Sequence, residues 1–159
     1  MGKSDRPHMP GYGLQDPEPE AGLLPWSFVQ ERMDSAWNYW LASVTPDGKP
    51  HAAPLWGIWV EDRFYFSTGA DSRKGRNLAQ NPEAIVHLES GYEVVILEGV
   101  VEPVPPGPLF DELDKQYYDK YSVQLDAENP VYGLTAHKAF AWRERDFPTS
   151  ATRWRLTDF

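Results

Sequence analysis

The sequence predicts a β-rich α+β domain, a small antiparallel barrel whose ends are closed by two or three helices. Its 159 residues are enough for one hydrophobic core. About seven short runs rich in aromatic and β-branched residues are separated by turn residues, without the regular alternation of strands and long helices that builds a parallel sheet. With 7 Trp, 8 Tyr, 7 Phe and 15 Pro, the chain is neither disordered nor a helical bundle.

The N-terminal segment differs in composition from the rest. Residues 1–25 contain five prolines, four glycines and several acidic side chains. Such a segment buries too little apolar surface to offset its ordering entropy, so we expect a flexible arm over residues 1–22 and one domain over residues 23–159. At the junction, Pro25 starts a helix whose apolar residues recur at spacings of three and four, and the helix ends near Ser35.

The first strands follow directly. Residues 37–45 and 50–60 form the arms of a hairpin, because Gly48 in the turn between them can adopt a positive φ. Pro54 cannot donate a ladder hydrogen bond and marks a bulge or an unpaired position in the second arm. A third strand covers residues 63–68.

The second half alternates helices and hairpins. Asp71 or Ser72 caps a short basic helix that Asn81 and Pro82 end, and strands over residues 84–89 and 93–102 follow. Residues 109–121 form an amphipathic helix with Lys120 on its polar side. Residues 135–145 and 152–156 form the closing strands.

Charge and cysteine content exclude several classes of function. Fifteen Lys and Arg against 24 Asp and Glu give a net charge of -9, which repels nucleic acid and anionic membranes. The absence of cysteine excludes disulfides, cysteine metal sites and a thiol nucleophile. Without an apolar run of about 20 residues or an apolar leader, we expect a cytoplasmic protein. The four histidines have no metal-ligand spacing, so no metal site is predicted.

One stretch carries recognisable chemistry. Ser67 and Thr68 end a strand, a glycine turn follows, and Arg73 and Lys74 open a helix whose free N–H groups favour an anion. This arrangement suits a phosphate monoester, with Arg73 gripping two oxygens and Lys74 adding a point charge. The alternative is an ordinary basic helix start. However, cations are disfavoured in a first helical turn, so three of them, with Arg76, indicate a ligand.

The region from Trp40 to Glu102 resembles the flavin-binding split β-barrel family, which includes pyridoxamine 5'-phosphate oxidases, flavin reductases and F420-dependent reductases. The resemblance rests on the segments ASVTPDGKPHAAPLW, FYFSTGADSRKGRNLAQNP and EVVILEGVVEPV, in this order and spacing. It implies that the barrel is split and that Ser67, Thr68, Arg73 and Lys74 bind the cofactor phosphate.

The resemblance also implies that the strand from His51 to Trp56 is the wall on which the flavin ring lies. Backbone amides near Pro54 would polarise the ring, and Trp56 would border it, although Trp56 could instead be a core residue. Arg63 could reach the same phosphate or a longer anionic tail, or simply be an exposed strand-end arginine.

The sequence also departs from the family pattern. The pyridoxamine 5'-phosphate oxidases have a substrate-binding lysine at the position of Trp56, and residues 152–159 lack the basic and imidazole groups of their C-terminal segment. We therefore do not expect pyridoxamine phosphate as substrate.

The main hypothesis is an oxidoreductase in which FMN passes hydride to or from a small organic substrate without a catalytic side chain. An F420-dependent reductase, with Lys49, Arg63 and Arg76 holding its acidic tail, and a non-catalytic flavin-binding protein are the alternatives.

The surplus of aromatic residues predicts a homodimer, and the resemblance implies that the cofactor lies at the subunit interface. Because Trp is enriched in interface cores, the candidate contacts are Trp37, Trp40, Trp59, Trp142 and Trp154. The alternative is a monomer that buries these side chains itself.

Overall fold

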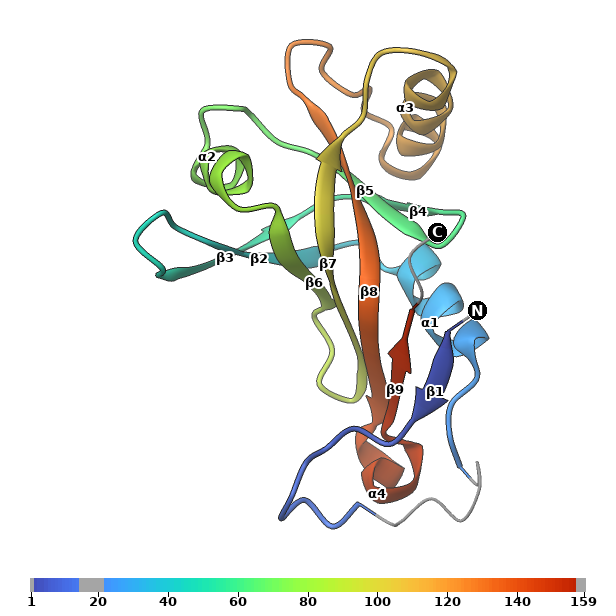
Figure 1. The fold of residues 1–159 in the computed structure, drawn as a ribbon. Coiled ribbons are helices and arrows are strands. Elements are labelled where there is room, and N and C mark those ends of the chain that lie inside the picture. The colour runs from blue at the N-terminus through green and yellow to red at the C-terminus, as the bar shows by residue number, and fades with distance from the viewer. Residues whose placement is uncertain (1, 15–21, 157–159) are drawn as a thin grey trace.

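The computed structural model describes residues 2–14 and 22–156, in which a single antiparallel sheet is flanked by helices (Figure 1). The strand order is β1-β9-β8-β7-β6-β2-β3, and the β4–β5 hairpin joins this path through β8. The strands are β1 (Lys3–Asp5), β2 (Tyr39–Val44), β3 (Pro50–Leu55), β4 (Ile58–Val60), β5 (Arg63–Ser67), β6 (Glu83–Leu88), β7 (Glu93–Pro103), β8 (Val131–Arg143) and β9 (Thr152–Arg155). The predicted β-rich split-barrel architecture is confirmed.

The barrel is split because β8 changes its partner along its length. Its first residues pair with β5, up to Leu134 opposite Phe64, and its later residues pair with β9 from Lys138 onward. On its other side β8 pairs with β7, with a register shift between Glu98 and Gly99. A Cβ on Gly99 would lie 2.2 Å from the Thr135 carbonyl oxygen, so only glycine allows the backbones to approach this closely.

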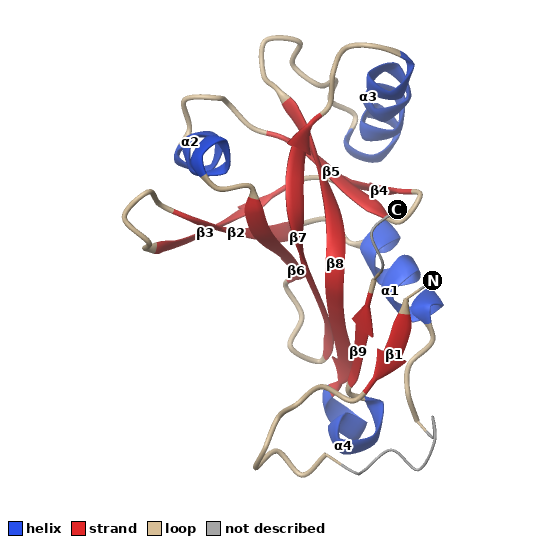
Figure 2. Cartoon of the chain, viewed as in Figure 1, coloured by secondary structure: helices blue, strands red, loops and turns tan. Residues whose placement is uncertain are grey.

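Four helices flank the sheet in the described part of the chain. They are α1 (Trp26–Ser35), α2 (Arg73–Gln80), α3 (Pro108–Tyr121) and the short α4 (Phe147–Ser150), which follows a 3₁₀ turn over Glu144–Asp146. Figure 2 shows α2 and α3 toward one end of the sheet, α4 at the other end and α1 along the side. Three of these helices were predicted. The four-residue α4 is too short to give a periodic sequence pattern.

Two apolar clusters fill the interior. In the larger one, Phe28, Val29 and Met33 of α1 pack on the inward side chains of β2, β5, β6, β7 and β8. The smaller one lies beneath α3, whose Leu113 and Tyr121 contact Ile58, Tyr65 and Val131. The tyrosine that ends α3 is therefore packed against the chain just after β3.

The opposite side of the central sheet is not covered by a helix. No helix lies in front of β6, β7 and β8 in Figure 1. The pairing register turns half-buried side chains of these strands and of β2 to this side. We call this set the outer face; its apolar members are Trp40, Ile85, Val94, Ile96, Phe140 and Trp142. Trp142 meets Phe147 of α4 edge to face at 5.5 Å, and no helix of the described part of the chain covers the rest of this apolar surface.

Two predictions about the ends of the chain, the place of Trp154 and the flexible N-terminal arm, require correction. Trp154, expected at a subunit interface, is 3% exposed and packs against Trp26 with a ring distance of 5.4 Å, because β9 turns it into the core. The predicted flexible arm contains the strand β1, which pairs with β9. Asp5 of β1 accepts two hydrogen bonds of 2.8 Å from Arg153 and one of 2.8 Å from Arg155. Residues 15–21 of the arm lie outside the described residues.

None of the described helices is long and apolar enough to cross a lipid bilayer.

Candidate functional site

The N-terminus of α2 is built by local hydrogen bonds. Ser72 is the N-cap, and its Oγ accepts a bond from the Gly75 N–H at 3.0 Å. A Cβ on Gly75 would lie 2.3 Å from the Gly69 carbonyl oxygen, so the glycine lets the preceding loop fold tightly onto the helix. The loop and the helix start therefore form one compact unit that carries the predicted phosphate ligands.

Three cations lie on this unit without a compensating acid. Arg73 and Arg76 are exposed and Lys74 is half-buried. Among the described residues, no carboxylate lies within 4 Å of any of them. Arg73 acts at longer range on Asp47 in the β2–β3 turn: hydrogen bonds from Thr45 and Lys49 lower the pKa of Asp47, with a smaller contribution from the charge of Arg73. The surplus positive charge fits a bound anion.

The two hydroxyls of the predicted site are already committed as donors. Ser67 Oγ donates to the Pro130 carbonyl oxygen at 3.0 Å. Ser72 Oγ donates its one proton to the Gly69 carbonyl oxygen at 2.6 Å, so Thr68 Oγ1, 3.0 Å away, is the donor between those two hydroxyls. With these two hydroxyl protons engaged, an anion at this site would be held by Arg73, Lys74 and backbone N–H groups.

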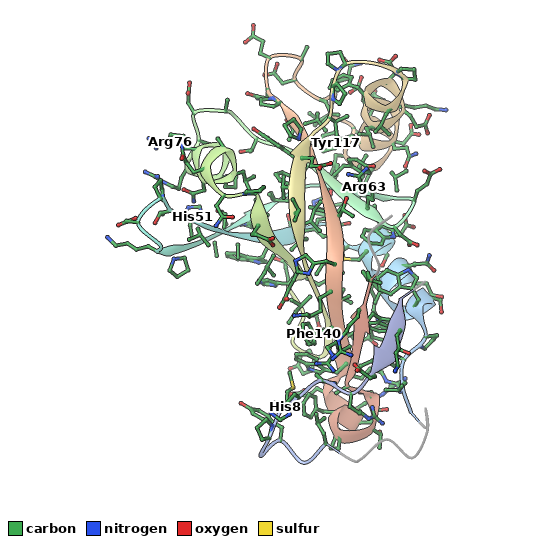
Figure 3. All side chains as sticks on the ribbon, viewed as in Figure 1. His8, His51, Arg63, Arg76, Tyr117 and Phe140 are labelled. Atoms are coloured by element: carbon green, nitrogen blue, oxygen red, sulfur yellow. The ribbon has the colours of Figure 1, made fainter. Side chains whose placement is uncertain are left out.

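A buried contact ties α2 to β2, the strand that pairs with the predicted ring wall β3. Asn77 of α2 is fully buried and donates from Nδ2 to Ser43 Oγ on β2 at 3.1 Å. Ser43 is directly opposite His51 on β3, and partners across a ladder share one face, so His51 lies on the α2 side of the sheet. Figure 3 shows His51 and Arg76 at the same end of the molecule. His51 Nδ1 and Asn77 Oδ1 are buried without a hydrogen-bond partner.

The predicted ring wall is an edge strand. β3 ends the strand order, so only one of its two backbone edges is paired, with β2. Pro50 and Pro54 are four residues apart and therefore face the same edge, and a proline that faces the ladder would break it. We infer that both face the open edge, where the Ala52 N–H is then the one amide donor of the strand. Of the two alternatives for Pro54, a bulge or an unpaired position, the bulge is not found, because the pairing runs without a shift from Tyr39–Leu55 to Val44–Pro50, and the open edge fits the unpaired position.

Aromatic side chains gather where β3 ends. The ring of Trp56 stacks on Tyr121 of α3 with centroids 4.5 Å apart and planes 5° apart. Trp37 meets Trp56 edge to face at 5.8 Å. Trp56 is 36% exposed and Trp37 51% exposed, so both present ring surface to solvent. The interpretation of Trp56 as a core tryptophan is therefore wrong.

Arg63 is not brought to this site. It opens β5, whereas Ser67 closes it, which separates the two residues by four strand steps or roughly 13 Å. Its Nη2 lies 3.9 Å from Glu102 Oε2, and both residues line a cavity of about 670 Å³ beside the split in β8. Figure 3 shows Arg63 on the other side of β7 and β8 from His51 and Arg76.

Several residues of the site were not predicted. Ser43 and Asn77 have ordinary strand and helix positions in the sequence. Only the structure shows that their hydrogen bond connects α2 to the β2–β3 pair. Lys120, predicted on the polar side of its helix, is half-buried and donates from Nζ to Tyr39 Oη at 2.8 Å. Burial lowers the pKa of Lys120 to about 8, opposed by the charge of Asp34. No group of three His, Cys, Asp or Glu residues that could hold a metal is present in residues 2–14 and 22–156.

Sequence comparisons match this region to known proteins. The family model described as "Pyridoxamine 5'-phosphate oxidase" matches residues 29–144. A pyridoxine/pyridoxamine 5'-phosphate oxidase of Alkalilimnicola ehrlichii is 30% identical over 109 residues, 67% of this chain and 51% of that protein. The enzyme of the same name from Gluconobacter oxydans is 40% identical over 67 residues, 40% of this chain and 34% of that protein. The chain thus matches about half or less of the length of these relatives.

Solved structures share the fold. A conserved hypothetical protein from Mycobacterium tuberculosis superposes with a TM-score of 0.70 at 20% identity, covering 79% of this chain and 89% of the other. An F420 reductase gives 0.58 at 21% identity, covering 69% and 94%. A heme storage protein from Vibrio cholerae gives 0.57 at 17% identity, covering 70% and 86%. At these identities the structures support the architecture and do not distinguish between cofactors.

Proposed function

The chain belongs to the pyridoxamine 5'-phosphate oxidase family, and on this premise we propose that it is a flavin-dependent oxidoreductase that binds FMN. The observation that carries the proposal is the group of cations at the start of α2, which lack a carboxylate within 4 Å among the described residues. The same helix is fixed through Asn77 and Ser43 to the strand pair that carries His51.

The residues present fit FMN in size and polarity. Arg73 and Lys74 would hold the phosphate, with Ser67 and Thr68 beside them. Four strand steps, about 13 Å, separate His51 from Leu55 at the end of β3, so the strand offers an extended surface along which a flavin ring can lie. The Ala52 N–H on the open edge near Pro54 would face the polar edge of the ring, and His51 Nδ1, buried without a partner, offers a further polar contact.

FMN, when bound, supplies hydride transfer between its ring and the substrate. The chain's own contribution is binding, orientation and exclusion of water. Arg73 and Lys74 bind the anionic end, the edge of β3 orients the ring, and the stacked Trp56 shields one end of it. No side chain is assigned to proton transfer. Because Trp56 offers a flat apolar surface without a cation, we propose a flat or apolar acceptor rather than pyridoxamine phosphate.

We also propose that the protein is a homodimer through its outer face, with the cofactor at the interface. Six half-buried apolar side chains share this face, and a two-fold axis would bury each of them twice. Trp40 and Trp142 are the two expected interface tryptophans that lie on it. Trp37 is exposed next to Trp56, where a second subunit could cover the ring end of the site.

The charges near the site favour FMN over F420. Of the three cations expected to hold an acidic tail, Lys49 forms an ion pair of 3.1 Å with Asp47 and Arg63 lies in a separate cavity. Only Arg76 remains close to the start of α2. An F420-dependent reductase of the same fold is therefore the weaker proposal, and a non-catalytic cofactor-binding protein remains the alternative if no turnover is found.

The test is a visible absorption spectrum of the purified protein, followed by mass determination of the molecule released by heat. We expect the two-band spectrum of an oxidised flavin and the mass of FMN, and bleaching by a nicotinamide reductant that an added quinone or nitro compound reverses. A deazaflavin spectrum with a longer-tailed mass would replace FMN by F420, and a Soret band would indicate haem. A protein that neither retains nor rebinds a flavin would refute the proposal.

A further inference from the structure

Side chains of the last turn of α3 form hydrogen bonds with the backbone of Gly57, the residue that follows Trp56. Tyr121 Oη accepts a hydrogen bond from the Gly57 N–H at 3.0 Å and lies 2.8 Å from the carbonyl oxygens of both Gly57 and Trp37, between which its one proton is shared. Lys120 Nζ donates to the Gly57 carbonyl oxygen at 3.2 Å. Both backbone polar groups of Gly57 are therefore bonded to neighbouring side chains of one helix turn.

Gly57 can be held in this way because it has no side chain. A Cβ at this position would lie 2.2 Å from the Phe64 ring, so the backbone fits directly against the core. Gly57 is buried, and Trp56 lies at the surface before it. The direction of the Trp56 indole is thus set by a fixed peptide on one side and by the Tyr121 ring beneath it.

Lys120 has an unusual environment for a lysine. Its Nζ lies 4.9 Å from the Tyr39 ring centre and 5.1 Å from that of Tyr121, and it donates to Tyr39 Oη. No carboxylate lies within 4 Å of it among the described residues, and Asp34 of α1 acts on it only at longer range. A half-buried ammonium without an ion pair costs folding free energy. If this position served only the stability of the fold, an apolar side chain would be favoured here.

We propose that Lys120 is a positioning residue, which together with Tyr121 fixes Gly57 and thereby presents the face of Trp56 at the ring end of the site. The inference rests on the proposed function, in that it takes the strand from His51 to Trp56 as the wall of the flavin ring. It adds a determinant outside that strand: a helix more than 60 residues later in the chain sets the shape of the surface that an acceptor meets.

The positioning depends on the charge of Lys120, because a charged donor binds a carbonyl more strongly than a neutral amine. The titratable groups around it are Tyr39 from β2 and Tyr121 from α3, which its Nζ contacts, and Asp34 from α1; Tyr117 of α3 lies behind them against Tyr121, with ring centroids 4.8 Å apart. Burial raises the pKa of all three tyrosines, that of Tyr121 to about 12. The three phenols therefore remain protonated while Lys120 loses its proton near pH 8.

The experiment compares wild type with Lys120→Met, which keeps a linear apolar side chain but removes the donors and the charge. Lys115→Met, an exposed lysine of the same helix, is the matched control. Near-ultraviolet circular dichroism and tryptophan fluorescence of the cofactor-free protein are recorded from about pH 6.5 to 10. We expect a transition near pH 8 in wild type and Lys115→Met that is absent from Lys120→Met, and that disappears in a Trp56→Phe background.

The second measurement uses FMN and a quinone acceptor. Because the phosphate end is remote, Lys120→Met should change the FMN Kd by less than about threefold and raise the acceptor KM by about fivefold or more, with a smaller change in kcat. Tyr121→Phe, which loses only the hydroxyl, serves where Lys120→Met folds poorly, and should likewise change the Trp56 signal.

Two results would overturn the inference: a pH transition that persists in Lys120→Met, or Trp56 signals that neither Lys120→Met nor Tyr121→Phe alters. If wild type fails to bind FMN while the Lys120-dependent transition is present, the proposed function fails and the positioning of Trp56 by Lys120 stands.

Discussion

Asn77 donates its side-chain amide to Ser43 across the boundary between α2 and β2. This buried bond sets the distance between the cations of α2 and the strand pair that carries His51. Asn77→Asp keeps the shape of the side chain but adds a buried negative charge close to the proposed phosphate. We expect a loss of about 1–3 kcal/mol in the free energy of unfolding and weaker FMN binding, measured by thermal unfolding and flavin titration. Gln80→Glu, which adds the same charge at the exposed end of α2, should have a much smaller effect on FMN.

The cations of α2 should dominate the affinity for FMN. Replacing Arg73 by Ala is expected to weaken binding by about 1.5–3 kcal/mol, the range of a charge-assisted hydrogen bond, and the double replacement of Arg73 and Lys74 by more. Isothermal titration with FMN measures this directly. Lys115→Ala is the control. Ser67→Ala should have little effect, since the Ser67 proton is committed to Pro130. Unchanged affinity in the double variant would remove these residues from the site.

The bond between Asp5 and Arg153 predicts a pH-dependent stabilisation of the N-terminal strand. The hydrogen bond from Arg153 lowers the pKa of Asp5 below its ordinary value of 3.8, helped by the charges of Arg153 and Arg155 and the hydrogen bond from Arg155, while burial acts in the opposite direction. Because the folded-state pKa is depressed, the stabilisation is present above the unfolded-state pKa and is lost as the pH falls through the folded-state value.

Asp5→Asn should therefore lower the free energy of unfolding by about 1 kcal/mol at neutral pH. This is less than the effect of breaking a buried ion pair, because the Asp5 site is partly exposed to solvent. Thermal unfolding of both proteins at several pH values tests this, with Glu89→Gln as an exposed control. The difference between wild type and Asp5→Asn should shrink below about pH 3.8. A difference that is constant with pH would argue against the ion pair.

The outer face should control the oligomeric state. Ile96 lies opposite Phe140 in the middle of this face, so Ile96→Lys places two like charges near the axis of a two-fold dimer. We expect light scattering at low micromolar concentration to give a dimer for wild type and a monomer for the variant, with reduced FMN retention. Tyr92→Lys, at a side chain 75% exposed in the β6–β7 turn, should remain dimeric. A wild-type monomer that retains FMN would disprove the interface site.

Burial of Lys120 should also appear in the pH dependence of stability. Its folded-state pKa is about 8 against an ordinary value of 10.5, so between these two pH values the unfolded state binds more protons. Wild-type stability should therefore rise over this interval by about 1 kcal/mol, or about 2–4 °C in Tm, relative to Lys120→Met. The raised pKa values of the tyrosines act in the opposite direction above about pH 10, so the two proteins are compared between about pH 8 and 10. Parallel stability curves for the two proteins would contradict this prediction.

Local signals account for most of the fold. Pro25, Gly48 and the Ser72 cap each act on the backbone within a few residues of themselves, so the elements that they bound were located correctly. β1 was missed because its stability comes from Arg153, 148 residues away, while its own composition resembles that of an unstructured segment.

The same distinction applies to the site. The cations of α2 are adjacent in sequence and could be identified, whereas the position of Arg63 depends on which end of β5 meets α2. Helical periodicity placed Lys120 on the polar side of α3. The structure places it against Tyr39 because a neighbouring segment, the chain at Gly57, covers that side of the helix. No pattern within α3 contains this information.

The two prolines of β3 have a further consequence for the protein in concentrated solution. An unpaired strand edge with a full set of amide donors is a template on which another chain can add a strand and start fibril growth. With Pro50 and Pro54 on its open edge, β3 offers only the Ala52 amide there, so an incoming strand would leave most of its carbonyl groups unsatisfied. The edge can thus stay open for a small molecule while it resists self-association, and Pro54→Ala should increase the rate of aggregation on heating.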